Sequence, residues 1–385
     1  MILMLNKSKL ANFNIIMINL DGLRRDKIPL CDSLLSLIKE SYFFNQMNTV
    51  APYTFASIHA IMSGMYPSSN GVDGYYNMFK FKNNEIITLA EALKNSDYFT
   101  YCDINSKAII PKKGFDKYEI YDEQIIDFTH RHCEIIKKLS KKKFFLFLQN
   151  TETHNNLVRE IIKNDKDNLT NNDYFNSLKE NDLRYNSHLP KTNFYVKSIV
   201  QALKNLNLYD KTILIIFSDH GTSIGEKTGE KFYGVFLYDY TLNVFTILHI
   251  PNHDPVTINK QCRTIDLFPT ILELVNSKNP LQNNIQGESL IPLIKEDSKD
   301  REVFAETGGL YGPWPSPEKH NVFCIKYNQK KLIYNASPST WEFYDLKKDP
   351  KELNNIFSEK SIEIQSYKKK LLFYLEKNNI HTKIS

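Results

Sequence analysis

NFYVKSIVQALKNLNL, residues 193–208, is followed almost at once by TILIIFSD, residues 212–219. Apolar side chains in the first stretch recur at the spacing of one helix face, at Val196, Ile199, Val200 and Leu203. The second stretch is a short run of β-branched and other apolar residues, which is typical of a strand buried on both faces. Together they predict a helix that leads directly into a buried strand.

The same alternation extends outward along the chain in both directions. Strands are predicted at residues 14–20, 98–104, 142–150 and 244–250, and helices at residues 31–41 and 87–96. Strands that alternate with helices of this length indicate parallel βαβ units. The predicted fold class is therefore α/β, with a central, mostly parallel sheet flanked by helices.

The length of 385 residues exceeds what one hydrophobic core of about 250–300 residues supports. We therefore expect a large α/β domain over residues 12–299 and a small C-terminal α+β subdomain over residues 300–385. In the latter, alternating hairpin-like strands precede an amphipathic closing helix. Residues 155–192 are rich in Asn, Lys and Asp and weakly periodic, which predicts a polar insertion or lid.

Composition excludes several classes of function. The net charge is +5, both signs are interspersed and no basic stripe carries aromatics, so nucleic acid is not an expected partner. The five cysteines are far apart and form no CxxC pair, which favours reduced thiols. No apolar run approaches the roughly 20 residues of a membrane span, and the first residues do not resemble a signal peptide. The expected location is the cytoplasm.

Polar residues that could bind a metal ion or take part in catalysis follow several predicted strands. Asp21 comes after the first strand, Glu152 and His154 come after the strand at 142–150, and Asp219 and His220 end the strand at 212–219. Ligands of parallel sheets sit beyond the carboxyl ends of the strands. Carboxylate oxygens and an imidazole nitrogen there suit a divalent cation such as Zn²⁺ or Mn²⁺.

APYTFASIHAIMSG, residues 51–64, places hydroxyl groups at a predicted helix start. Thr54 alone is typical of a residue that caps the helix beginning near Phe55. It is also a candidate nucleophile, and the residues by themselves leave both interpretations open.

The order of these segments resembles the sulfatase-like branch of the alkaline phosphatase superfamily. NIIMINLDGLRRD is similar to the first strand and metal-binding Asp of that family, and TFASIHAIMSGMYPSSNGV is similar to its nucleophile segment. ETH resembles its substrate segment, and FSDHGTSIGEKTGEKFYGVFLYDYTLNV its second metal segment. The closing segments RTIDLFPTILELV, IQGESLIPLI and EFYDLKKDPKELNNI follow in the same order, so the resemblance runs from about residue 13 to about residue 357.

The resemblance implies one divalent cation (Zn, Mn, Ca or Mg) held by four residues: Asp21, Thr54, Asp219 and His220. It implies that Thr54 is the nucleophile. His154 would donate to a non-bridging oxygen or to the leaving group. Lys227 and Lys231 are candidate anion clamps, with solvated loop lysines as the competing interpretation.

Several positions depart from the family pattern. Typical sulfatases carry a Cys or Ser that is oxidised to formylglycine, followed by a proline and an arginine; here Thr54, Ala56 and Ile58 stand at those positions. A threonine has a secondary alcohol and cannot become that aldehyde. Gly22 stands where typical sulfatases have a second Asp, and His220 stands where Asn is common.

These departures predict a metal-dependent hydrolase or transferase of phosphoric esters, diesters in particular, working through a phospho-threonine intermediate on Thr54. The predicted substrate is a phosphoester of a small molecule, a glycan or a lipid headgroup. The insertion and the loop at residues 306–320 are expected to shape its pocket. Two alternatives remain: a sulfuric ester hydrolase without formylglycine, and a catalytically silent member that keeps the metal as structure. The oligomeric state is left open.

Overall fold

A large mixed sheet forms the centre of the protein. The computed structural model describes residues 10–123, 125–165, 173–277, 284–295, 299–308, 321–336 and 339–380. In order across the sheet, the strands are β4 (Lys117–Ile120), β3 (Phe99–Ile104), β5 (Phe144–Asn150), β1 (Asn14–Leu20), β6 (Thr212–Phe217), β7 (Asn243–His249), β2 (Tyr42–Asn48) and β8 (Val256–Ile258), with β9 (Cys262–Arg263) also paired to β2.

In the order from β4 to β6, each strand runs parallel to the next. Strand β7 is antiparallel to both of its neighbours, β6 and β2. This confirms the predicted α/β class with a mostly parallel sheet. Strand β2 was not predicted, and its sequence YFFNQMN explains why. Its pairing with β7 shifts register between Phe44 and Met47, so the polar residues Asn45 and Gln46 interrupt the apolar pattern.

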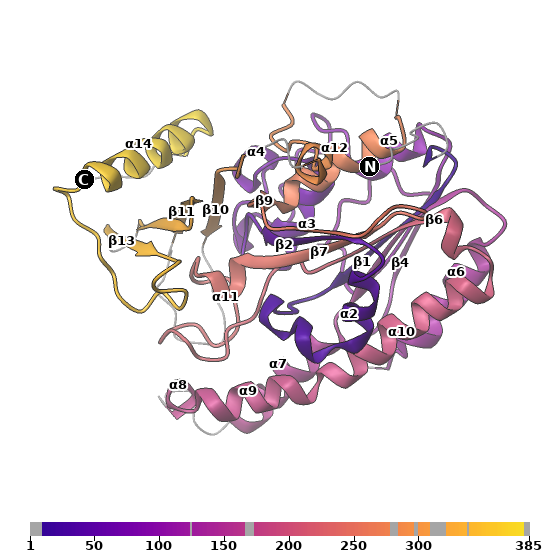
Figure 1. Ribbon diagram of the computed structural model, residues 1–385, viewed down its shortest axis with the longest axis horizontal. Helices are drawn as coiled ribbons and strands as arrows, with labels where there is room; N and C mark the ends of the chain where they lie inside the picture. Colours follow the sequence, from indigo (N-terminus) through magenta and orange to yellow (C-terminus); the bar gives the residue numbers. More distant parts are fainter. Residues whose placement is uncertain are drawn as a thin grey trace.

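Helices cover both faces of the sheet (Figure 1). One face packs against α2 (Asp32–Ile38), α6 (Phe128–Leu139) and α10 (Leu189–Asn205); the other packs against α3 (Thr54–Ser63), α5 (Leu89–Lys94) and α12 (Leu267–Leu274). Alternate residues of β1 serve the two cores: Ile16 and Ile18 face the first, and Ile15 and Met17 the second. Such a strand is apolar throughout because both of its faces are buried.

The polar region at residues 155–192 is helical where it is described. It contains most of α7 (Glu152–Asp165), then α8 (Asp173–Asn176), α9 (Leu178–Ser187) and the start of α10. Tyr185 of α9 is buried; its hydroxyl donates to the carbonyl of Gly22 at 3.1 Å and accepts from the N–H of Arg24 at 2.9 Å. These helices therefore brace the loop that follows β1. A lid movement of this region stays a prediction.

The C-terminal part forms a second, antiparallel sheet of β10 (Val303–Gly308), β11 (Asn321–Tyr327), β12 (Lys330–Asn335) and β13 (Thr340–Asp345), and α14 (Ile362–Lys377) packs against it. It lies at one end of the molecule (Figure 1). This confirms the predicted hairpins and closing helix, while the boundary at residue 300 stays a prediction. Residues 309–320 of the predicted pocket loop lie outside the described residues.

The remaining short elements are η1 (Arg25–Leu30), α4 (Pro67–Asn70), η2 (Tyr75–Asn77), η3 (Tyr209–Lys211), α11 (Asp239–Leu242), η4 (Thr264–Asp266) and α13 (Ile291–Ile294). All five cysteines are free thiols. In the described ranges, no helix has the length and apolar character needed to cross a membrane.

Candidate active site

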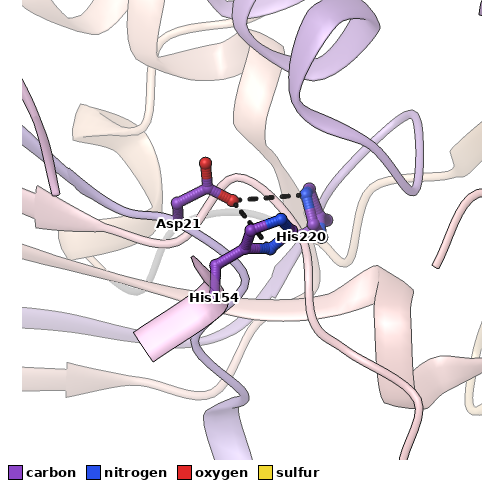
Figure 2. A group of neighbouring side chains, drawn as sticks. All are labelled: Asp21, His154 and His220. Atoms are coloured by element: carbon purple, nitrogen blue, oxygen red, sulfur yellow. Dashed lines mark ion pairs between the residues drawn. The ribbon is translucent and has the colours of Figure 1, made fainter. Parts of the chain in front are cut away.

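Four elements bring the predicted residues together at the carboxyl end of the sheet. Asp21 follows β1, Asp219 and His220 follow β6, His154 lies in the first turn of α7, and Thr54 is the first residue of α3. Ligand atoms of Asp21, His154 and His220 all lie within 4.8 Å of one another. Figure 2 shows one carboxylate oxygen of Asp21 joined by dashed lines to both imidazole rings, at 3.5 Å from Nδ1 of His154 and 3.6 Å from Nε2 of His220.

Thr54 points its hydroxyl into this group. Its Oγ1 lies 3.2 Å from Nε2 of His220, and 3.4 and 3.5 Å from the carboxylate oxygens of Asp21. The N-cap of α3 is Tyr53, which has extended backbone dihedrals, so Thr54 does not cap the helix. The structure therefore excludes the capping role and places the hydroxyl beside Asp21 and His220, while the role of Thr54 as a nucleophile stays a prediction.

The hydrogen bond of Nδ1 fixes the tautomer of His220. Nδ1 lies 2.7 Å from the carbonyl oxygen of Gly221, which can only accept, so Nδ1 carries the proton. Nε2 then presents a lone pair to Thr54 Oγ1. Gly221 allows this tight corner, because a Cβ there would lie 2.0 Å from the carbonyl oxygen of Tyr240. The Ser-Asp-His-Gly corner thus brings Nε2 of His220 within 3.7 Å of Oδ2 of Asp219.

Asp219 is held by its backbone and keeps one oxygen available. Its N–H donates to Asn19 Oδ1 at 3.1 Å, its carbonyl accepts from Ser57 Oγ at 2.8 Å, and its Oδ1 lies 3.3 Å from the N–H of Gly22. Oδ2 is buried and has no hydrogen-bond partner among the described residues. It lies 3.7 Å from Nε2 of His220. An oxygen in this position costs free energy unless a cation or a proton satisfies it.

The electrostatics of the site fit a cation. Burial and the neighbouring Asp219 carboxylate raise the pKa of Asp21 to about 8, although His220 and a hydrogen bond from Gln149 Nε2 at 2.9 Å oppose the shift. Burial lowers the pKa of His154, which favours the neutral ring that a metal ion requires. Two carboxylates and two imidazoles that converge in this way are a donor set suited to a divalent cation.

One ring nitrogen of His154 has a hydrogen-bond partner: Nε2 lies 3.3 Å from the hydroxyl of Tyr233. The other, Nδ1, lies 3.5 Å from Asp21 Oδ1. The donation of a proton by His154 to a leaving group stays a prediction. Sequence reasoning did not identify Tyr233, because nothing in its sequence neighbourhood distinguishes it. Gln149 did leave a signal, as the polar residue near the end of the apolar strand FFLFLQN.

The two lysines predicted as anion clamps have other contacts. Lys227 Nζ donates to the carbonyl of Glu352 and lies 4.3 Å from the ring centroid of Tyr238, which directs it toward the C-terminal subdomain. Lys231 is buried, with Nζ 5.5 Å from the ring centroid of Tyr174. Their role as clamps stays a prediction.

The fold is an α/β sandwich with an acid, imidazole and hydroxyl cluster at the carboxyl end of its sheet, in keeping with the resemblance to the alkaline phosphatase superfamily. The family model described as Sulfatase matches residues 11–277, and a model described as N-sulphoglucosamine sulphohydrolase, C-terminal, matches residues 229–378. The chain therefore belongs to the sulfatase family, in the sulfatase-like branch of the alkaline phosphatase superfamily.

Curated relatives match about half of the chain. Arylsulfatase K of Bos taurus is 30% identical over 181 residues, covering 45% of this chain and 32% of the relative. N-acetylglucosamine-6-O-sulfatase of Bacteroides thetaiotaomicron is 28% identical over 184 residues, covering 46% of this chain and 32% of the relative. The matches thus span about a third of these proteins.

Solved structures match nearly the whole fold. A 2-O GAG sulfatase superposes with a TM-score of 0.79 at 18% identity, covering 96% of this chain and 93% of that one. Phosphonate monoester hydrolase of Agrobacterium radiobacter superposes with a TM-score of 0.75 at 14% identity, covering 95% and 96%. At these identities the likeness establishes the fold alone.

Proposed function

We propose that the protein is a cation-dependent hydrolase of sulfuric esters that works from the Thr54 hydroxyl and not from formylglycine. The observation that carries the proposal is the sulfatase match over residues 11–277, a range that contains Asp21, Thr54, Asp219 and His220. The names of the curated relatives support a sulfate ester, and one structural neighbour was solved with D-glucosamine-2-N,6-O-disulfate. A sulfated sugar is therefore the first substrate class to test.

The chain's own residues supply the parts of a displacement. Asp21, Asp219 and His220 would hold the cation, which when bound favours the threonine alkoxide and neutralises charge on the ester. Thr54 Oγ1 loses its proton and forms a bond to sulfur as the bond from sulfur to the ester oxygen breaks. The leaving oxygen takes up one proton, so the alcohol departs neutral and the step balances. Water then attacks the same sulfur, which releases hydrogen sulfate and restores the hydroxyl. The N-terminus of α3, where Thr54 sits, favours the developing negative charge.

Hydrolysis of phosphoric esters, the main prediction from the sequence, is the second candidate. One observation favours it: position 54 is a threonine, and its alcohol cannot form the aldehyde hydrate that releases sulfate in typical sulfatases. A covalent phosphate ester on Thr54 would be cleaved by water at phosphorus without any aldehyde.

A rate assay of the purified protein with added Zn²⁺, Mn²⁺ or Ca²⁺ distinguishes the two candidate functions. Its substrates are p-nitrophenyl sulfate, p-nitrophenyl phosphate, bis-p-nitrophenyl phosphate and glucosamine sulfates. The proposal expects the highest kcat/KM on a sulfate ester, and a higher value on either phosphate would replace it with the second candidate. If Thr54→Ala binds ligands as the wild type does and no ester is turned over, the protein is a silent family member.

A further inference from the structure

Gly22 leaves a space beside Asp21 that the ring of His154 fills. The backbone of Gly22 is in the left-handed region, with φ of +66°. A Cβ built there would lie 3.1 Å from Nδ1 of His154 and 2.8 Å from Oγ1 of Thr222. The residue after Asp21 therefore carries no side chain at the place where the imidazole enters the site. The absence of a side chain at position 22 thus allows the ring of His154 to lie close to the backbone beside Asp21.

Nδ1 of His154 has the surroundings of a metal ligand. The side chain is only 11% exposed, and Nδ1 faces Oδ1 of Asp21 at 3.5 Å. No described residue makes a hydrogen bond with Nδ1. A buried ring nitrogen that faces a buried carboxylate across this distance leaves room for a cation between them. The same carboxylate oxygen lies 3.6 Å from Nε2 of His220, so one ion can reach all three groups.

Tyr233 contacts the other ring nitrogen of His154, Nε2. Its hydroxyl lies 3.3 Å from Nε2 of His154, and its ring packs 5.0 Å from His154 and 4.6 Å from His220, measured between centroids. Tyr75, which packs 4.6 Å from the ring of Tyr53 between centroids, also neighbours the side chain of Tyr233. The contacts of the Tyr233 ring with both imidazoles hold its phenol beside His154.

We propose that His154 is an additional ligand of the cation through Nδ1, and that Tyr233 is the positioning residue that aims it. An imidazole that binds a metal through Nδ1 carries its proton on Nε2, and the phenol oxygen of Tyr233 accepts that proton's hydrogen bond. Partners of this kind fix the ring and the tautomer of metal-binding histidines, and losing one typically costs 10–100-fold in affinity. The inference deepens the proposed function, since it concerns the same site, but it makes a claim about metal binding that needs no turnover.

The test is the affinity of the purified protein for Zn²⁺, measured by titration calorimetry without any ester. His154→Ala and Tyr233→Phe are each expected to weaken binding by about tenfold or more. The double variant should bind no more weakly than His154→Ala alone, because Tyr233 acts through His154. In the wild type, a ring N–H signal of His154 should be protected from exchange, and Tyr233→Phe should lose that protection.

Tyr98→Phe is the matched control. Its hydroxyl donates to the carbonyl of Phe13 at 3.0 Å, near the start of β1, so the variant loses a buried phenol hydrogen bond away from the site and should keep the Zn²⁺ affinity. If Tyr233→Phe does not fold, Tyr75→Phe replaces it and should weaken binding less. Unchanged affinity in His154→Ala overturns the inference, as does an effect of Tyr233→Phe that persists in the double variant. If the Zn²⁺ affinities are as expected but no ester is hydrolysed, the proposed function is wrong and the inference about His154 and Tyr233 still holds.

Discussion

Thr54 Oγ1 lies 3.2 Å from Nε2 of His220, although 166 positions separate the two residues along the chain. Because Gly221 holds the proton on Nδ1 of His220, the two atoms face each other as a hydroxyl and a lone pair. Without this contact Thr54 would be an ordinary first residue of a helix. With it, the hydroxyl lies in one cluster with Asp21 and His220, which supports the proposal that Thr54 is the nucleophile.

Removal of that hydroxyl should abolish turnover. We expect Thr54→Ala to lower kcat by at least about a thousandfold, since the nucleophile is gone, whereas Thr54→Ser should retain measurable activity. Steady-state rates on the best ester of the panel check this. Ser63→Ala is the control, because Ser63 lies on the same helix and its hydroxyl donates to His59 O at 2.7 Å. Activity of Thr54→Ala close to that of the wild type would rule out the nucleophile assignment.

Metal removal should lower both activity and stability. Asp219 is fully buried with one oxygen unsatisfied, so a bound cation stabilises the folded state. At a metal concentration of 100 times Kd the gain is about 2.7 kcal/mol, which thermal unfolding with and without a chelator measures. Asp219→Asn should lose this metal-dependent shift, and Asp210→Asn, at an exposed position, should keep it. A shift of equal size in Asp219→Asn would remove Asp219 from the ligand set.

His59 should make the protein less stable in acid. Burial lowers the pKa of His59 from 6.5 to about 4, against a hydrogen bond from Nδ1 to Phe55 O. Between pH 6.5 and 4 the unfolded chain binds a proton that the native state does not, so stability falls as the pH falls through this window. The loss from this group approaches about 3 kcal/mol at pH 4. Denaturant unfolding at several pH values measures how steeply the free energy of unfolding falls in acid. This fall should be shallower in His59→Gln than in the wild type, and unchanged in His130→Gln. Equal slopes in the wild type and both variants would contradict the prediction.

Two adjacent lysines of β12 should differ sharply in their effect on folding. Lys331 is fully buried, with Nζ 2.5 Å from Asp239 and 2.8 Å from Glu352, whereas Lys330 pairs with the half-exposed Glu363. We expect Lys331→Met to cost about 3–5 kcal/mol, because it leaves buried carboxylates uncompensated. Lys330→Met should cost about 1 kcal/mol or less. Denaturant titration of both variants gives their free energies of unfolding. Similar costs would mean that the buried cluster of Lys331, Asp239 and Glu352 does not stabilise the C-terminal subdomain.

Sequence alone predicted the fold where apolar patterns were continuous. Strand β1 and the α10–β6 pair follow from unbroken apolar runs and from regular helical spacing. Strand β2 was missed because its bulge places polar residues inside it. Helix α9 was missed because its sequence LKENDLRYNS buries only Asn181 and Tyr185, which is too little apolar surface to produce a periodic signal.

The candidate site was predictable only in part, for a similar reason. Asp21, Asp219 and His220 follow buried strands directly, and the topology of a parallel sheet brings such positions together. Tyr233 reaches the site from a loop, whose course no local pattern determines, and Tyr75 lies in the short element η2 (Tyr75–Asn77). The importance of Gly22 emerged only when the structure placed His154 Nδ1 3.1 Å from where its Cβ would stand.

The most direct test of the central claim is mass spectrometry of the protein after turnover of p-nitrophenyl sulfate has been quenched. The intact mass shows whether a group has been added, and digestion then locates the modified peptide. Without an aldehyde, water must attack the sulfur of the covalent ester, so this second step should be slow enough for the adduct to accumulate. The account predicts one sulfo group on the peptide that contains Thr54, and none in Thr54→Ala. An adduct that forms from bis-p-nitrophenyl phosphate but never from a sulfate ester would contradict it.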